Sequence, residues 1–92
     1  MSNNLRRTID EVQSEILRAV RLKSEGRFQY VIADPIPAMW KNAMLMEETG
    51  EVSREVLALE GIVQEKGDLA ALRKELIQVA ALATFWADSI PR

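Results

Sequence analysis

Four glutamates cluster near the middle of the chain, at a spacing that puts their carboxylates on one side of a helix. Glu47, Glu48, Glu51 and Glu55 fall within roughly a quarter-turn when each residue advances the helix by about 100°. No lysine or arginine stands four residues from any of them, although like charges at this spacing destabilise a helix. A divalent cation bound by the oxygens would remove the repulsion. The alternative is a solvated acidic face, and the stripe alone leaves both interpretations open.

Composition restricts any chemistry to carboxylates, amides, hydroxyls and basic groups. The 92 residues include no cysteine and no histidine, which excludes thiol nucleophiles, zinc–thiolate sites and a Ser-His-Asp triad. Carboxylate oxygens suit hard cations such as Mg²⁺ or Mn²⁺. If the chain binds a cofactor through its glutamates, we therefore expect Mg²⁺, with Mn²⁺ as a substitute.

Charge and hydropathy also limit the partners. The net charge is −2, whereas a protein that binds nucleic-acid polymers usually carries a dense basic face. The N-terminal residues lack an apolar signal core, and no run approaches the roughly 20 apolar residues of a membrane span. We therefore expect a cytoplasmic protein that binds neither a membrane nor a nucleic-acid polymer.

Helical periodicity dominates the sequence and predicts helices at about residues 4–24, 38–59 and 69–89. Asp34 is the expected cap of the second helix, and Asp68 is the expected N-cap of the third. Apolar residues in the first predicted helix recur at steps of three and four and so share one face. They are Leu5, Ile9, Val12, Ile16 and Val20. One face of the third helix carries Leu72, Leu76, Val79, Ala83, Trp86 and Ile90. Because the third helix contains a long chargeless run, we expect it to be central.

Chain length predicts a single domain over residues 1–92. Apolar residues make up 48% of the chain, which is much for a domain that can bury only a modest share of its surface. Three helices also fall one short of a four-helix bundle, so a helix from another subunit is the natural completion. We therefore expect an all-α fold, a helical bundle of three main helices per chain with a further short piece possible before the second, completed by oligomerisation into a homodimer or homotetramer.

One more carboxylate lies in the third predicted helix. Glu75 stands at the edge of the apolar face, and Gln78 follows one turn later. Taken alone, Glu75 is most simply a salt-bridge partner, whereas an amide within a chargeless run needs hydrogen-bond partners. The interval from Glu51 to Glu75 suits a helix end, a loop and a new helix start.

The segments MLMEETGEVSREVL and LRKELIQVAALATFWADSI resemble the MazG-like family of all-α nucleoside triphosphate pyrophosphohydrolases. The family pattern is E-E-x-x-E on one helix and E-x-x-D on a later one. Glu47, Glu48 and Glu51 match the first cluster, and Glu75 begins the second. Gln78 stands where the family has aspartate. The resemblance covers the second and third predicted helices, slightly more than half of the chain.

The resemblance implies metal-dependent hydrolysis of a (d)NTP to the nucleoside monophosphate and pyrophosphate, a housekeeping reaction of the nucleotide pool. The implied metal ligands are Glu47, Glu48, Glu51, Glu75 and Gln78. Glu48 or Glu47 would be the catalytic base, acting through water, and metal catalysis of this kind needs no histidine. Because Gln78 brings no charge, the alternative is a non-catalytic MazG-like dimerisation module with a degenerate metal site. A helical partner-binding protein without a nucleotide site is a third possibility.

Four further side chains are candidates for binding the substrate. Trp40 lies on the carboxylate side of its helix, about two turns before the glutamates, where it could stack on a base or pack in a core or interface. Lys41, Arg54 and Lys74 could contact phosphate or base, with ordinary surface or salt-bridge roles as the alternative. Residues 28–30 precede the second helix, and a base pocket could form there.

Overall fold

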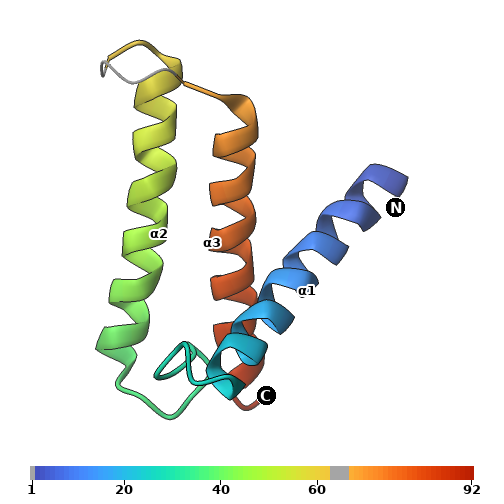
Figure 1. Cartoon of the computed structure of the whole chain (residues 1–92), viewed down its shortest axis with the longest axis vertical. Coiled ribbons are helices and arrows are strands. Elements are labelled where there is room, and N and C mark those ends of the chain that lie inside the picture. The colour runs from blue at the N-terminus through green and yellow to red at the C-terminus, as the bar shows by residue number, and fades with distance from the viewer. Residues whose placement is uncertain (1, 63–66) are drawn as a thin grey trace.

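The computed structural model describes residues 2–62 and 67–92, and this part of the chain contains three helices and no strand (Figure 1). The helices are α1 (Asn3–Ser24), α2 (Ala38–Leu59) and α3 (Leu69–Ser89). The three predicted helices are thus confirmed, and α1 begins one residue earlier than expected. Across the described ranges, none of the helices combines the length and the apolar character needed to span a membrane.

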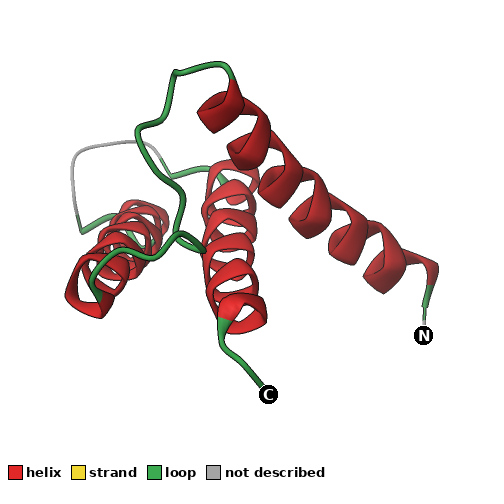
Figure 2. Cartoon of the chain, turned by 90° about the horizontal axis from the view of Figure 1, so that it is seen from below, coloured by secondary structure: helices red, strands yellow, loops and turns green. Residues whose placement is uncertain are grey.

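The third helix is central, as predicted. It runs alongside α2 in the opposite direction and also packs against α1, whereas α1 and α2 make no direct helix–helix contact (Figure 1). Figure 2 shows that the N-terminal end of α1 points away from the α2–α3 pair. The fold is therefore an antiparallel helix pair with a third helix laid across one side.

The connection between α1 and α2 folds back into the core. Gly26 follows the end of α1 with φ of 76°, a left-handed conformation that glycine adopts without strain. Val31 and Ile32 are buried, and Ile32 is only 1% exposed. Residues 25–37 form turns and bends, so the short fourth helical piece considered from the sequence is absent from this connection.

The predicted caps have different outcomes. Asp68 accepts a hydrogen bond from the backbone N–H of Ala70 at 2.9 Å, as expected of an N-cap. The prediction for Asp34 is wrong, because α2 begins after Pro37 without a side-chain cap. Asp34 instead accepts hydrogen bonds from the Lys23 ammonium at 2.7 Å and from the Val31 N–H at 2.9 Å. It therefore ties the connection to the end of α1.

The core is small and differs from the predicted apolar face of α3. Its buried members are Leu22, Val31, Ile32, Ala58, Ile77 and Ala81. On the face predicted from periodicity, Leu76 is 49% exposed and Ile90 is 55% exposed. Because α3 is packed on two sides, by α1 and by α2, its buried positions follow those two contacts rather than one stripe.

Candidate metal centre and adjoining pocket

Three carboxylates from two helices meet between α2 and α3. Glu48, Glu51 and Glu75 each offer one oxygen, and these oxygens all lie within 4.8 Å of one another. Glu48 and Glu51 are three residues apart and therefore share a face of α2. The antiparallel α3 brings Glu75 opposite them. The result is a compact group of hard oxygen donors, which we call the glutamate triad.

Ionisation of two members of the glutamate triad, Glu48 and Glu75, is disfavoured in the protein. Burial, followed by the charges of Glu51, Glu75 and Glu47, raises the pKa of Glu48 to about 7. Burial and the neighbouring Glu51 also raise the pKa of Glu75, and the charge of Lys74 opposes this effect. One oxygen of Glu75, Oε2, is buried without a hydrogen-bond partner in the described structure.

The donor set fits a hard divalent cation. A buried carboxylate oxygen without a partner costs free energy, and like charges this close repel one another. A cation such as Mg²⁺ or Mn²⁺ would satisfy the oxygen and neutralise the charges. The glutamate triad can therefore hold a metal ion, and its geometry alone does not select which one.

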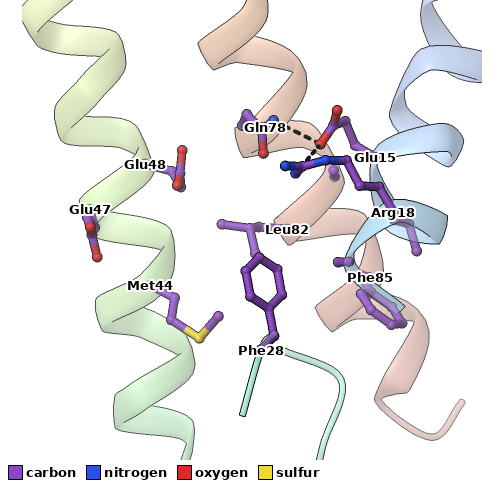
Figure 3. Close-up of a pocket in the computed structure, with 12 residues that line it drawn as sticks. Glu15, Arg18, Phe28, Met44, Glu47, Glu48, Gln78, Leu82 and Phe85 are labelled. Carbon is purple, nitrogen blue, oxygen red and sulfur yellow. Dashed lines mark hydrogen bonds and ion pairs between the residues drawn. The ribbon is translucent and has the colours of Figure 1, made fainter. Parts of the chain in front are cut away.

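The other two predicted metal ligands lie outside the glutamate triad. Glu47 is exposed on α2 next to Glu48, and its charge is among those that raise the pKa of Glu48. Gln78 is directed toward α1, where its Nε2 donates a hydrogen bond of 2.9 Å to Oε2 of Glu15 (Figure 3). This bond gives the amide the partner that its place in a chargeless run requires.

A pocket of about 210 Å³ adjoins the glutamate triad and is formed by all three helices and the first connection (Figure 3). Glu48 belongs both to the glutamate triad and to the pocket wall. The polar lining residues are Glu15, Arg18, Glu47, Glu48 and Gln78, and the apolar ones are Ile16, Ala19, Phe28, Met44, Ala81, Leu82 and Phe85. This volume is below the roughly 300–1,000 Å³ of pockets for drug-sized ligands. The pocket therefore suits a single ring system rather than a whole nucleotide.

The four predicted substrate residues do not line this pocket. Trp40 is 52% exposed and packs against Tyr30, with ring centroids 5.9 Å apart. Lys41 acts electrostatically on Asp34. Lys74 borders a second groove, between α1 and α3. Arg54 is exposed on α2 and takes part in an interaction of its own.

Two charged residues of the pocket wall, Glu15 and Arg18, were not predicted from the sequence. They resemble the other charged residues of α1, and only the crossing of α1 over α3 selects them. Phe28 belongs to the loop in which a base pocket was considered, and it does line the pocket.

Comparison of the chain with protein-family models, with curated proteins and with solved structures finds no match. The fold and the site by themselves define the class of protein. It is an all-α protein with three described helices, in which a glutamate triad able to hold a cation lies beside a pocket that suits a single ring system.

Proposed function

We propose that this protein is a MazG-like, Mg²⁺-dependent pyrophosphohydrolase that converts a (d)NTP to the nucleoside monophosphate and pyrophosphate. The observation that carries the proposal is the glutamate triad, whose three oxygens lie within 4.8 Å of one another beside a pocket that shares Glu48. Support also comes from the sequence, in which the members of the triad occupy the acidic positions of the MazG-like pattern.

The reaction joins a water oxygen to the α-phosphorus and breaks the bond from that phosphorus to the bridging oxygen of the β-phosphate. Glu48, Glu51 and Glu75 would hold the cation, which when bound neutralises phosphate charge and makes water a stronger nucleophile. Glu47 lines the same pocket but lies outside the triad. Between Glu48 and Glu47, Glu47 is therefore the better candidate to accept the proton of the attacking water.

The pocket would receive the base of the nucleotide while the phosphates extend toward the glutamate triad. Phe28, Met44 and Leu82 provide apolar surface on which a base can pack (Figure 3). Trp40, Lys41, Arg54 and Lys74 lie outside the pocket, so a role for them in substrate binding is restricted to the phosphates or to a neighbouring subunit.

Two observations support association of the chains as part of the same proposal. The accessible surface is 6940 Å², about 1,500 Å² more than the roughly 5,400 Å² expected for a compact monomer of this mass. The radius of gyration is 14.7 Å, against about 12 Å for a compact domain of this length. A typical stable interface covers about 800 Å² per partner. The excess is therefore large enough for one full subunit interface.

The exposed apolar side chains of α1 supply a surface for that interface. They are Leu5, Ile9, Leu17 and Val20, with 45–60% of each side chain exposed. Since α3 is the only described helix that packs against α1, a second copy of the chain could cover this face and complete the bundle. We therefore include a homodimer, or a homotetramer built from it, in the proposed function.

The second candidate function is a non-catalytic MazG-like dimerisation module with a degenerate metal site. The observation that favours it is that Gln78, which stands at an acidic position of the MazG-like pattern, donates its amide N–H to Glu15. Gln78 therefore adds no charged ligand to the three carboxylates of the glutamate triad. A module of this kind would bind a cation and associate, but it would not turn over nucleotides.

Turnover separates the two candidates. Purified protein is incubated with each canonical (d)NTP and Mg²⁺ or Mn²⁺, and pyrophosphate and monophosphate are quantified. Glu48→Gln and Glu75→Gln should abolish turnover, while Glu60→Gln, at the exposed end of α2, should leave it unchanged. Thermal stabilisation by Mg²⁺ without turnover would favour the dimerisation module. Neither turnover nor a metal effect would contradict both candidates.

A further inference from the structure

The pocket beside the glutamate triad has a polar end and an apolar end (Figure 3). Phe28 and Met44 lie at the apolar end, next to the first connection. Glu48, Gln78 and Arg18 lie at the polar end, and because Glu48 is also a member of the glutamate triad, this end adjoins the triad. A ligand whose base packs at the apolar end therefore brings its first phosphate to the polar end.

Of the described residues that line the pocket, only Arg18 is basic, and it shares the wall with the carboxylates of Glu15, Glu47 and Glu48. One nitrogen of its guanidinium lies 3.7 Å from Oε2 of Glu15, which is longer than a hydrogen bond. Within residues 2–62 and 67–92, Arg18 makes no other ion pair or side-chain hydrogen bond. Because a guanidinium carries five N–H donors, most of these donors are left for water or a ligand.

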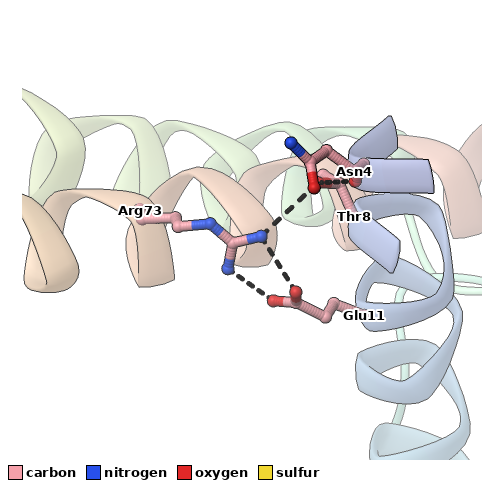
Figure 4. A network of polar contacts seen from close by, with 4 residues as sticks. All are labelled: Asn4, Thr8, Glu11 and Arg73. Carbon is pink, nitrogen blue, oxygen red and sulfur yellow. Dashed lines mark hydrogen bonds and ion pairs between the residues drawn. The ribbon is translucent and has the colours of Figure 1, made fainter. Parts of the chain in front are cut away.

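The simpler explanation is that Arg18 only forms a structural ion pair, and Arg73 provides the comparison (Figure 4). The Arg73 guanidinium donates to both oxygens of Glu11, at 2.5 and 2.9 Å, and to Thr8 Oγ1 at 3.4 Å. These bonds fasten α3 to α1. The single long contact of Arg18 joins two residues of the same helix, and 51% of the Arg18 side chain is exposed. Exposed pairs of this kind contribute little to stability, so a structural role does not account for Arg18.

We propose that Arg18 binds the α-phosphate, the phosphate attached to the nucleoside of the substrate. A phosphate at the polar end of the pocket lies among carboxylates, and the planar fork of an arginine pairs two phosphate oxygens at once. Glu15, which accepts a hydrogen bond of 2.9 Å from Gln78, positions the guanidinium there. The inference rests on the proposed function, because it assigns a group of that substrate to a residue of the same site.

The test compares Arg18→Gln, which removes the charge, with Arg21→Gln as a matched control. Arg21 is one turn further along α1, is exposed and does not line the pocket. Calorimetric titration in Mg²⁺ measures the binding of AMP, CMP, GMP and UMP and of the four nucleosides. Arg18→Gln should weaken monophosphate binding by about 10- to 100-fold, the contribution of charged hydrogen bonds. Nucleoside binding, the melting temperature and the Arg21→Gln control should match the wild type.

A second variant, Arg18→Lys, covers the case in which Arg18→Gln fails to fold, as judged by circular dichroism. Lysine keeps the charge but cannot pair two phosphate oxygens in one plane, so it should weaken monophosphate binding several-fold and by less than glutamine does. For hydrolysis, kcat/KM of the preferred (d)NTP should fall in the same order, with Arg21→Gln at the wild-type value.

The outcomes separate this inference from the proposed function. If a (d)NTP is hydrolysed and neither Arg18 variant changes kcat/KM or monophosphate binding, the inference is overturned while the proposed function stands. Equal weakening of nucleoside and monophosphate binding in Arg18→Gln would also overturn it, because Arg18 would then act through the fold or the base. Monophosphate binding that depends on Arg18 would support the inference even if no nucleotide is hydrolysed. A wild type that binds no monophosphate would overturn it together with the nucleotide site.

Discussion

At the scale of single residues, Glu48 combines three effects that disfavour its ionised form. It is partly buried, it lies beside Glu51 on its own helix, and it faces Glu75 on α3, so that its pKa is raised to about 7. A carboxyl group of this kind is protonated in part at neutral pH and becomes an anion when a cation binds. The protonation state of Glu48 therefore depends both on pH and on whether a cation is bound.

The raised pKa of Glu48 predicts a pH dependence of stability in the absence of divalent cations. Between the ordinary glutamate pKa of about 4.5 and the raised value of about 7, the folded protein retains a proton that the unfolded chain releases. The free energy of unfolding should therefore fall as pH rises through this window. Thermal unfolding in EDTA at pH 5 and pH 8 measures the effect, and Glu48→Gln should reduce the difference. An unchanged difference in the variant would contradict this assignment.

The depressed pKa values of Asp34 and Glu11 act in a different window. Hydrogen bonds from Lys23 and from Arg73, respectively, lower them, so their contribution is lost only as pH falls below the ordinary carboxylate range. Measurements above pH 5 are therefore insensitive to these two carboxyl groups.

Cation binding by the glutamate triad predicts a rise in melting temperature with Mg²⁺. A ligand at 100 times its dissociation constant stabilises the folded state by about 2.7 kcal/mol. Glu75→Gln should remove the response to Mg²⁺ because it removes a donor of the triad. Differential scanning calorimetry with and without Mg²⁺ checks this, with Glu60→Gln as the control that should retain the response. A wild-type melting temperature indifferent to Mg²⁺ and to Mn²⁺ would exclude the metal site.

At the scale of elements, the connection between α1 and α2 contributes to the core although it contains no helix. It buries Val31 and Ile32, is tied to α1 through Asp34 and Lys23, and carries Phe28 to the pocket wall. The connection thus anchors one wall of the pocket to the core.

Truncation of Ile32 should therefore destabilise the protein strongly. Ile32 is 1% exposed, and large-to-small changes at buried positions cost about 2–5 kcal/mol. That is a large fraction of the total for a domain of this size. The matched control is Ile90→Ala, because Ile90 is 55% exposed and should change the unfolding free energy by about 0.5 kcal/mol or less. Equal effects in urea titrations would show that the connection is not part of the core.

At the scale of the whole molecule, the single chain leaves apolar surface uncovered. The exposed apolar side chains of α1 recur along the helix, and among the described helices only α3 packs against α1. Scattered exposed apolar residues are ordinary, but a contiguous apolar face is typical of an interface.

Charges on this face should dissociate the proposed dimer. Leu5 and Ile9 are 49% and 47% exposed and lie one turn apart, so the double variant Leu5→Glu, Ile9→Glu places charge at the interface with little cost to the isolated chain. Light scattering after size exclusion should give twice the chain mass or more for the wild type and the chain mass for the variant. Leu69→Glu, at the 71% exposed start of α3, should remain associated. A wild-type protein that elutes as a monomer at high concentration would contradict the prediction.

The sequence by itself determined the features that depend on neighbours along the chain. Helical periodicity located all three helices to within a residue, and the N-cap at Asp68 was predictable because a cap pairs with the next turn. The shared face of Glu48 and Glu51 follows from helix geometry in the same way.

Only the tertiary structure decided which side chains from different helices meet. Glu75 joins the glutamates of α2 because α3 runs antiparallel to that helix, and Gln78 is turned to Glu15, 63 positions away in the sequence, because α1 crosses α3. The buried face of α3 and the partners of Asp34 were mispredicted for the same reason. Side-chain pairing between helices depends on crossing geometry and packing, and periodicity within one helix carries no information about either.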